Sequence, residues 1–216
     1  MLPYTFEVFS LDHIVSIIVI LFLFIIFLGY NDKIGIEDDS KTFLIVLSVL
    51  MIFLDLSEDL VRIFTGYYSI TKDLPLQLCS IGVYLAAFNL MYRNQTIFNL
   101  IFYWGFVGAT NAILTPDGDL FELRIFFFYS QGYHAALIFA VLWMMIKYDM
   151  RMDYRSILQV VIYTNIIVGL ITIVNYVLDS NYMFLRVMPN SISPFLMGEW
   201  PTYIICLLYT SDAADE

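Results

Sequence analysis

The chain has 216 residues, of which 61% are hydrophobic and 14% are charged, and its formal net charge is −10. A water-soluble domain has about a quarter charged residues, so this composition excludes an ordinary soluble fold. The acidic balance also argues against a protein that binds nucleic acid.

Apolar stretches recur along the chain at lengths near the roughly 20 residues that cross a bilayer. They predict spans over residues 14–30, 43–60, 74–92, 97–115, 125–148 and 157–178, and a seventh span that begins near Trp200. The first stretch has no basic region before it and no small-residue cleavage site after it, so we expect a retained helix and not a signal peptide. The predicted fold is an all-α membrane protein, a bundle of seven transmembrane helices with the last one truncated.

The end of the chain differs from the rest. Residues 206–216 read CLLYTSDAADE, and this string resembles the translated read-through of a sequencing adapter. We therefore expect a polytopic membrane domain over residues 1–205 and a non-native tail over 206–216. Cys79 is then the single native cysteine, which excludes an internal disulfide.

The basic residues of the connections predict the orientation, because cytoplasmic loops are enriched in Lys and Arg. With the N-terminus outside, the inner connections hold Lys33, Lys41, Arg93, Lys147, Arg151 and Arg155. The outer connections hold Arg62, Lys72, Arg124 and Arg186. The excess favours an outside N-terminus.

Alternating spans bring the polar residues of the apolar segments near one membrane face. These residues are His13, Asp55, Glu58, Asp59, Cys79, Asn111, Asp117 and His134. Ionisable groups are costly in lipid and usually mark a functional site, so we predict a pocket at this face.

Each of these residues also has a structural interpretation. A cysteine in an apolar helix commonly serves as a small packing residue, and His134 is equally compatible with a helix-packing hydrogen bond. Asp117 stands in a Thr-Pro-Asp-Gly turn sequence. Glu58 is spaced to pair with Arg62 at i+4.

Other site chemistries lack the residues that they need. The chain has only two histidines and no HxxxH pair, whereas a zinc hydrolase uses about three protein ligands. No glycine-rich nucleotide loop and no lysine in the last span are present before the truncation. We expect neither a metal nor a cofactor.

Several motifs carry a resemblance to a known family. They are LPLQLCS at 74–80, the segment 104–117 that ends in LTPD, His134, the segment 181–189, and GEWPTY at 198–203. In this order and spacing the chain resembles the bacterial YwaF-like integral membrane family over residues 1–205. Two positions depart from the family: Gln77 replaces a usual histidine, and Tyr133 replaces a usual small residue.

That family is distantly similar to an animal transmembrane acyltransferase that moves polyunsaturated acyl chains between phospholipids. The resemblance implies a bacterial cell membrane protein in which Cys79 accepts the acyl chain and His134 is its base. It implies that Asn111 and Asp117 orient the imidazole or the acyl carbonyl. Candidate substrate contacts are Gln77, Ser80, Arg124, Arg186, Glu58 and His13, with the two arginines holding a lipid phosphate.

Membrane lipids are the expected partners, and the oligomeric state stays open. Two other classes of function are compatible with the same residues. One is a non-enzymatic protein that binds lipid or transports a small solute through the polar pocket. The other is a membrane scaffold.

Overall fold

The computed structural model describes residues 4–30, 41–193, 196 and 198–204, and all regular structure in these residues is helical. The helices are α1 (Leu11–Tyr30), α2 (Lys41–Thr65), α3 (Leu78–Tyr92), α4 (Gln95–Ile101), the π-helix η1 (Phe102–Val107), α5 (Gly108–Leu114), α6 (Arg124–Lys147) and α7 (Ile157–Leu178). Three short 3₁₀ turns are η2 (Gly118–Leu120), η3 (Tyr154–Ser156) and η4 (Tyr182–Phe184). The predicted tail at 206–216 and most of the predicted seventh span lie outside the described residues.

Four segments are long and apolar enough to cross a membrane: Leu11–Gly29, Gln95–Leu114, Arg124–Lys147 and Tyr154–Leu178. The second of these joins α4, η1 and α5 into one continuous helix. The predicted span at 43–60 corresponds to α2, which is long enough but holds several charged residues in its second half. The predicted span at 74–92 corresponds to α3, which has only 15 residues. A membrane protein with several apolar helices is thus confirmed, whereas a count of seven spans is not.

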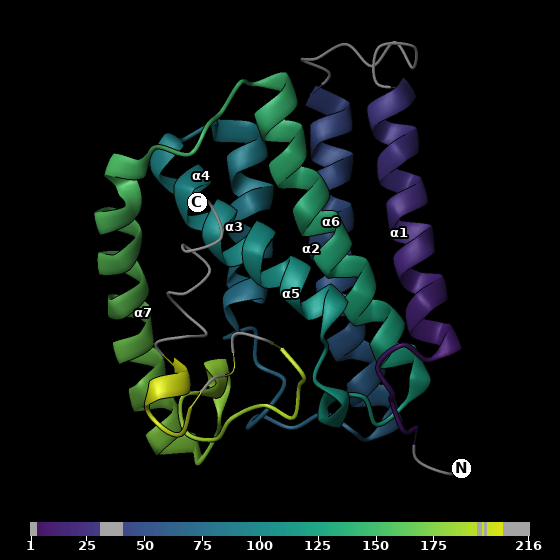
Figure 1. The fold of residues 1–216 in the computed structure, drawn as a ribbon, viewed down its shortest axis with the longest axis vertical. Helices are drawn as coiled ribbons and strands as arrows, with labels where there is room; N and C mark the ends of the chain where they lie inside the picture. Colours follow the sequence, from purple (N-terminus) through teal and green to yellow (C-terminus); the bar gives the residue numbers. More distant parts are fainter. Residues whose placement is uncertain (1–3, 31–40, 194–195, 197, 205–216) are drawn as a thin grey trace.

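Successive helices run in alternating directions, as Figure 1 shows. α6 is the central helix and packs against α1, α2, α3, α5 and η1, whereas α7 lies at the edge of the bundle. Trp143 and Leu137 of α6 are fully buried. Large apolar side chains point outward on α7, among them Ile173 and Tyr176, which suits a lipid environment.

Close packing around α6 depends on a glycine. A Cβ atom at Gly105, in η1, would lie 3.0 Å from Cγ of Leu137, which is closer than packed side chains normally approach. The absence of a side chain at Gly105 therefore lets the α4–η1–α5 helix lie directly against α6.

The connections at one end of the bundle are joined to one another, and we call this the loop end (lower end in Figure 1). It consists of residues 4–10, 66–77, 115–123 and 179–193. The Tyr182 hydroxyl donates to the Ile70 carbonyl at 2.6 Å and accepts from the Leu74 amide at 3.0 Å. Ser191 donates to the Thr115 carbonyl at 2.5 Å. Segments far apart in sequence thus form one folded cap.

The start of α3 differs from the sequence expectation. The residues before Leu78 are not helical, and Gln77 has an extended backbone with φ −74° and ψ 148°. Pro75 disfavours helix at Leu74. The Gln77 side chain accepts from the Met183 amide at 2.8 Å, so the residues before α3 pack into the loop end instead of extending the helix. Cys79 is therefore the second residue of α3, whereas a helix over the whole predicted span at 74–92 would place it more than one turn inside.

Candidate functional site

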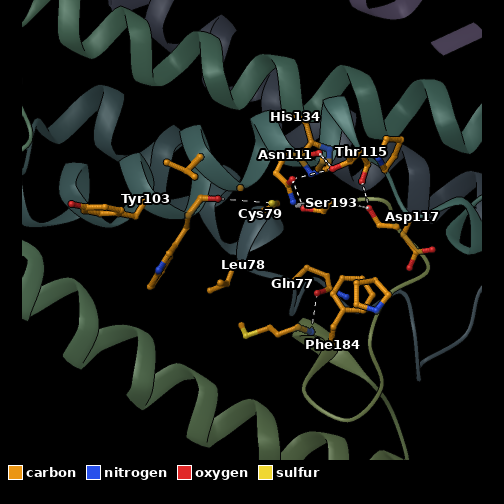
Figure 2. Close-up of a pocket in the computed structure, with 18 of the residues that line it drawn as sticks. Gln77, Leu78, Cys79, Tyr103, Asn111, Thr115, Asp117, His134, Phe184 and Ser193 are labelled. Atoms are coloured by element: carbon orange, nitrogen blue, oxygen red, sulfur yellow. Dashed lines mark hydrogen bonds between the residues drawn. The ribbon is translucent and has the colours of Figure 1, made fainter. Parts of the chain in front are cut away.

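A cavity of about 230 Å³ lies between α3, the α4–η1–α5 helix, α6, α7, residues 183–193 and Leu196. Most of its wall is apolar. Its polar lining residues are Gln77, Cys79, Tyr103, Asn111, Thr115, Asp117, Ser130, Tyr133, His134, Thr164, Ser191 and Ser193. Figure 2 shows Cys79, Asn111 and His134 in this cavity. A largely apolar pocket with a few convergent polar groups is typical of a ligand site.

Cys79 enters the cavity from the first turn of α3 and packs against the π-helical turn. Its thiol donates to the Trp104 carbonyl, with an S···O distance of 3.9 Å. A Cβ atom placed on Gly108 would lie 3.6 Å from the sulfur. The Trp104 indole also donates to Thr164 of α7 at 3.0 Å. π-Helical turns are rare and often occur at functional sites, so the thiol lies beside an unusual backbone element.

His134 lies on α6 with 5% of its surface exposed. Its Nδ1 is 2.7 Å from the Ser130 carbonyl, so Nδ1 must donate the proton of the neutral ring. Nε2 then carries a lone pair, and it has no hydrogen-bond partner in the described part of the chain. The ring is thus in the tautomer that can accept a proton from a group in the cavity.

Cys79 and His134 share the cavity but do not contact each other by a hydrogen bond in the described residues. The thiol is bonded to Trp104 and the imidazole to Ser130. Catalytic hydrogen bonds are often formed only when substrate is bound. The structure therefore brings the two groups into the wall of one cavity, each with a backbone carbonyl as its hydrogen-bond partner.

Asn111 is the polar group of α5 in the cavity wall. Its side-chain Oδ1 accepts from the Thr115 hydroxyl at 3.0 Å and from the Ser193 hydroxyl at 2.8 Å. The second bond joins the segment after α7 to α5, and this segment closes one side of the cavity.

Asp117 also lines the cavity, but its carboxylate is engaged in a turn. Its side chain accepts from the Asp119 amide at 3.0 Å at the start of η2. This contact agrees with the structural interpretation of Asp117 as part of a Thr-Pro-Asp-Gly turn. Burial raises the pKa of the Asp117 carboxyl, and the hydrogen bond from Asp119 opposes that shift.

Gln77 also lines the cavity and is bonded to the loop end. Its side-chain oxygen accepts from the Met183 amide at 2.8 Å. Met183 and Phe184 have positive φ angles of 56° and 53°, which are costly for non-glycine residues. Met183, Phe184, Ser191 and Ser193 were not among the predicted site residues. Their sequence has no local signal for the site, because only the fold of the loop end brings them to α5.

A second cavity of about 90 Å³ adjoins the first. The two share Gln77, Leu120, Phe121, Ser130 and Tyr133 in their walls. Glu58 and Ser80, both predicted to contact substrate, line this smaller cavity together with Asp55, Asp59, Arg62, Lys72 and Asp73.

The charges of the smaller cavity are largely paired. Arg62 forms ion pairs with Glu58 at 2.9 Å, Glu122 at 2.8 Å and Asp73 at 3.6 Å. The Tyr84 hydroxyl donates to Asp55 at 2.8 Å. The i+4 pairing of Glu58 with Arg62 that the spacing favoured is therefore present.

Three of the predicted substrate contacts line neither cavity. His13 is fully buried and uses both ring nitrogens, since Nδ1 accepts from the Phe9 amide at 3.0 Å and Nε2 donates to the Ile113 carbonyl at 2.8 Å. Arg124 pairs with Asp12. Arg186 pairs with Asp179 at 2.7 Å.

Within the described residues, no group of three or more His, Cys, Asp or Glu side chains is arranged to hold a metal ion. The chemistry available in the larger cavity is that of a thiol, an imidazole, an amide and several hydroxyls. These groups suit nucleophilic and acid–base steps on a polar group at the end of an apolar ligand.

The chain was compared with known proteins. No curated protein and no solved structure matches it. The model of the TMEM164 family matches residues 8–210, which is nearly the whole chain and includes every helix described above. The chain therefore belongs to the TMEM164 family.

Proposed function

We propose that this protein is a membrane enzyme that transfers or hydrolyses a lipid acyl chain, with Cys79 as nucleophile and His134 as base. One observation carries the proposal. A thiol and a histidine with an available Nε2 lie in the wall of the same, mostly apolar cavity. The sequence resemblance to a lipid acyltransferase supports the same assignment.

The proposed reaction has two steps. His134 Nε2 takes the proton of Cys79, and the thiolate sulfur attacks the ester carbonyl carbon of a phospholipid. The ester C–O bond breaks, and the departing lysolipid oxygen receives the proton from the imidazolium. A second lysolipid hydroxyl, or water, then loses its proton to His134 and attacks the thioester. The thiolate leaves and the acyl chain passes to the new oxygen.

The lining of the cavity supports an apolar substrate. Leu78, Val107, Val160 and Val161 face the space beside Cys79, and burial of CH₂ groups against such a wall contributes about 0.8 kcal/mol for each group. Gln77 lines both cavities, and Glu58 and Ser80 line the smaller one, where we place the polar part of the lipid. Asp117 is a further polar group in the wall of the larger cavity. Arg124 and Arg186 are paired with carboxylates and are assigned no role.

We further propose that the chain crosses a bacterial cell membrane seven times with its N-terminus outside, which places the loop end and Cys79 at the outer face. The charge of the connections supports this orientation. Cysteine-accessibility labelling should reach 117–124 from outside and 147–155 from the cytoplasm. Labelling of both loops from one side would contradict the alternating arrangement, and exchange of the two sides would move the site to the inner leaflet.

A second candidate function is non-enzymatic binding of a lipid in the same cavity. The observation that favours it is the hydrogen bond of the Cys79 thiol to the Trp104 carbonyl instead of to His134. In this alternative Cys79 is a packing residue and remains protonated.

A lipid-like acyl-thioester probe separates the two candidates. We expect labelling of Cys79 in the wild-type protein and in His13→Ala, and strong suppression in His134→Ala. His13 is the control because both of its nitrogens are already bonded. Equal labelling of all three proteins would rule out a catalytic pair of Cys79 with either histidine. Loss only in His13→Ala, in protein whose melting curve shows that it is folded, would reassign the base.

A further inference from the structure

The wall of the cavity next to Cys79 includes two residues of α5 that lie on one helix face. Gly108 lies against the sulfur, since a Cβ atom there would be 3.6 Å from Sγ. Asn111 is three residues later, and residues at i and i+3 are neighbours on a helix surface, about 4.5 Å apart along the axis. Asn111 is therefore the polar residue of α5 that lines the cavity beyond Gly108, and Figure 2 shows it in the cavity with Cys79.

The Asn111 amide directs its oxygen, Oδ1, towards two neighbouring hydroxyl groups. Two hydroxyl groups, from Thr115 and Ser193, donate to Oδ1. The amide NH₂ group is the other end of the side chain, and no partner for it is found among the residues that the structure describes. Asn111 thus presents donors, and not an acceptor, to the cavity.

We infer that Asn111 Nδ2 is the oxyanion donor of the site, that Thr115 and Ser193 are positioning residues for its amide, and that Gly108 keeps open the approach of a carbonyl to Cys79. This inference rests on the proposed function, because it assigns a role within acyl transfer to Cys79.

The chemistry requires such a donor. When the thiolate sulfur attacks a carbonyl carbon, the carbonyl π electrons move to oxygen and leave a negative charge there. In a cavity with apolar walls that charge has little solvation, so a fixed N–H donor stabilises the transition state. The tetrahedral intermediate then expels the leaving group and the oxygen regains its double bond.

Alkylation of a thiol passes through no oxyanion, so a comparison of the acylation and alkylation rates tests the inference. The full-length protein in detergent is given p-nitrophenyl decanoate, and the rapid release of p-nitrophenolate measures acylation of Cys79. In parallel, iodoacetamide measures alkylation of the same thiol. Asn111→Leu keeps about the size of the side chain, removes the donor and adds no charge beside the thiol. We expect its acylation rate to fall about 10²- to 10³-fold while its alkylation rate is unchanged.

Asn111→Ala is the second variant and should show the same split. Thr115→Val and Ser193→Ala leave the Asn111 side chain in place, so their acylation rates should fall by less, again with unchanged alkylation. Gly108→Ala introduces only an ordinary contact with the sulfur, and it should slow acylation by the decanoyl ester more than alkylation by the small reagent.

The outcomes distinguish the inference from the proposed function. If wild-type protein shows no acylation beyond that of Cys79→Ser, the proposed function is wrong. If wild-type protein is acylated and both Asn111 variants are acylated at the same rate, only the oxyanion assignment is wrong. A parallel loss of acylation and alkylation in both Asn111 variants would assign Asn111 a structural role and would also overturn the inference.

Discussion

The two histidines are both buried, yet their surroundings differ. His13, in the first turn of α1, has a backbone partner for each ring nitrogen and ties residue 9 to the end of α5. His134, in the larger cavity, has one ring nitrogen bonded to its own helix and the other directed to no described partner. The comparison teaches that burial alone does not distinguish a structural histidine from a candidate base. The number of ring nitrogens that already have a hydrogen-bond partner distinguishes the two.

The same contrast extends to the two cavities. In the smaller one, Arg62 is surrounded by carboxylates that neutralise it. In the larger one, the Asn111 amide and the His134 ring each retain an unused hydrogen-bonding atom among the described residues. We therefore expect changes at His13 and in the Arg62 ion-pair network to reduce stability, and changes at Cys79, Asn111 and His134 in the larger cavity to reduce chemistry with a smaller effect on stability.

The largest expected effect on stability is at Arg62. Arg62→Met leaves Glu58 and Glu122 partly buried without their partner, and we expect a loss of about 3–5 kcal/mol in the free energy of unfolding. Thermal unfolding in detergent measures it. Arg124→Met is the matched control, since its guanidinium is largely exposed, with 62% of the side-chain surface accessible, and its loss should be much smaller. Equal losses would show that the buried ion pairs of Arg62 contribute no more to stability than the exposed pair of Arg124.

The next effect compares the histidines directly. His13→Ala removes two buried hydrogen bonds and a packed ring, and we expect a loss of about 2–4 kcal/mol. His134→Ala removes one hydrogen bond to its own helix and borders a cavity that already exists, so its loss should be clearly smaller. Chemical denaturation of the two variants under the same conditions measures both. A larger loss for His134→Ala would reverse the comparison.

A smaller effect is expected from two glycines on the same helix. Gly105→Ala places a Cβ atom within 3.0–3.2 Å of three Leu137 side-chain atoms and should cost about 1–3 kcal/mol. Gly108→Ala meets only the Cys79 sulfur at 3.6 Å and should leave the melting temperature nearly unchanged. Melting curves of the two variants measure this difference. Similar melting temperatures would mean that α6 can move away from η1.

The smallest effect concerns Asp117. Burial raises its pKa, so the folded state favours the protonated form, and stability falls as the pH rises from the unfolded pKa through the folded one. Asp117→Asn keeps an acceptor for the Asp119 amide and removes the charge. We expect a gain of no more than about 0.5 kcal/mol at neutral pH that disappears towards pH 4. A loss of stability at neutral pH would show that the negative charge is needed.

Much of the fold could be predicted from the sequence, because the hydrophobic length of a membrane segment is a local property. The predicted segments 125–148 and 157–178 agree with α6 and α7 to within one residue. The π-helical turn at 102–107 has no such signal, and the late start of α3 depends on how residues 74–77 pack. Both features depend on contacts between segments that are distant in the sequence, and a local pattern does not encode such contacts.

The candidate site was predictable only in part for the same reason. Cys79, His134, Asn111 and Asp117 were predicted from their polarity at one depth, and all four line the larger cavity. His13 satisfied the same criterion but lies elsewhere, because one-dimensional depth does not say which face of a helix a residue occupies. Ser193 was missed because its contact with Asn111 joins residues 82 positions apart.

The most direct measurement of the central claim uses the purified protein in liposomes with a phospholipid that has an isotopically labelled acyl chain and an unlabelled lysophospholipid acceptor. Wild-type protein should produce labelled phospholipid from the acceptor, and the peptide containing Cys79 should gain the mass of the acyl chain. Cys79→Ser should give neither product at the wild-type rate, and His134→Ala should slow both by about 10²- to 10⁴-fold. Transfer by Cys79→Ser at the wild-type rate would contradict the account.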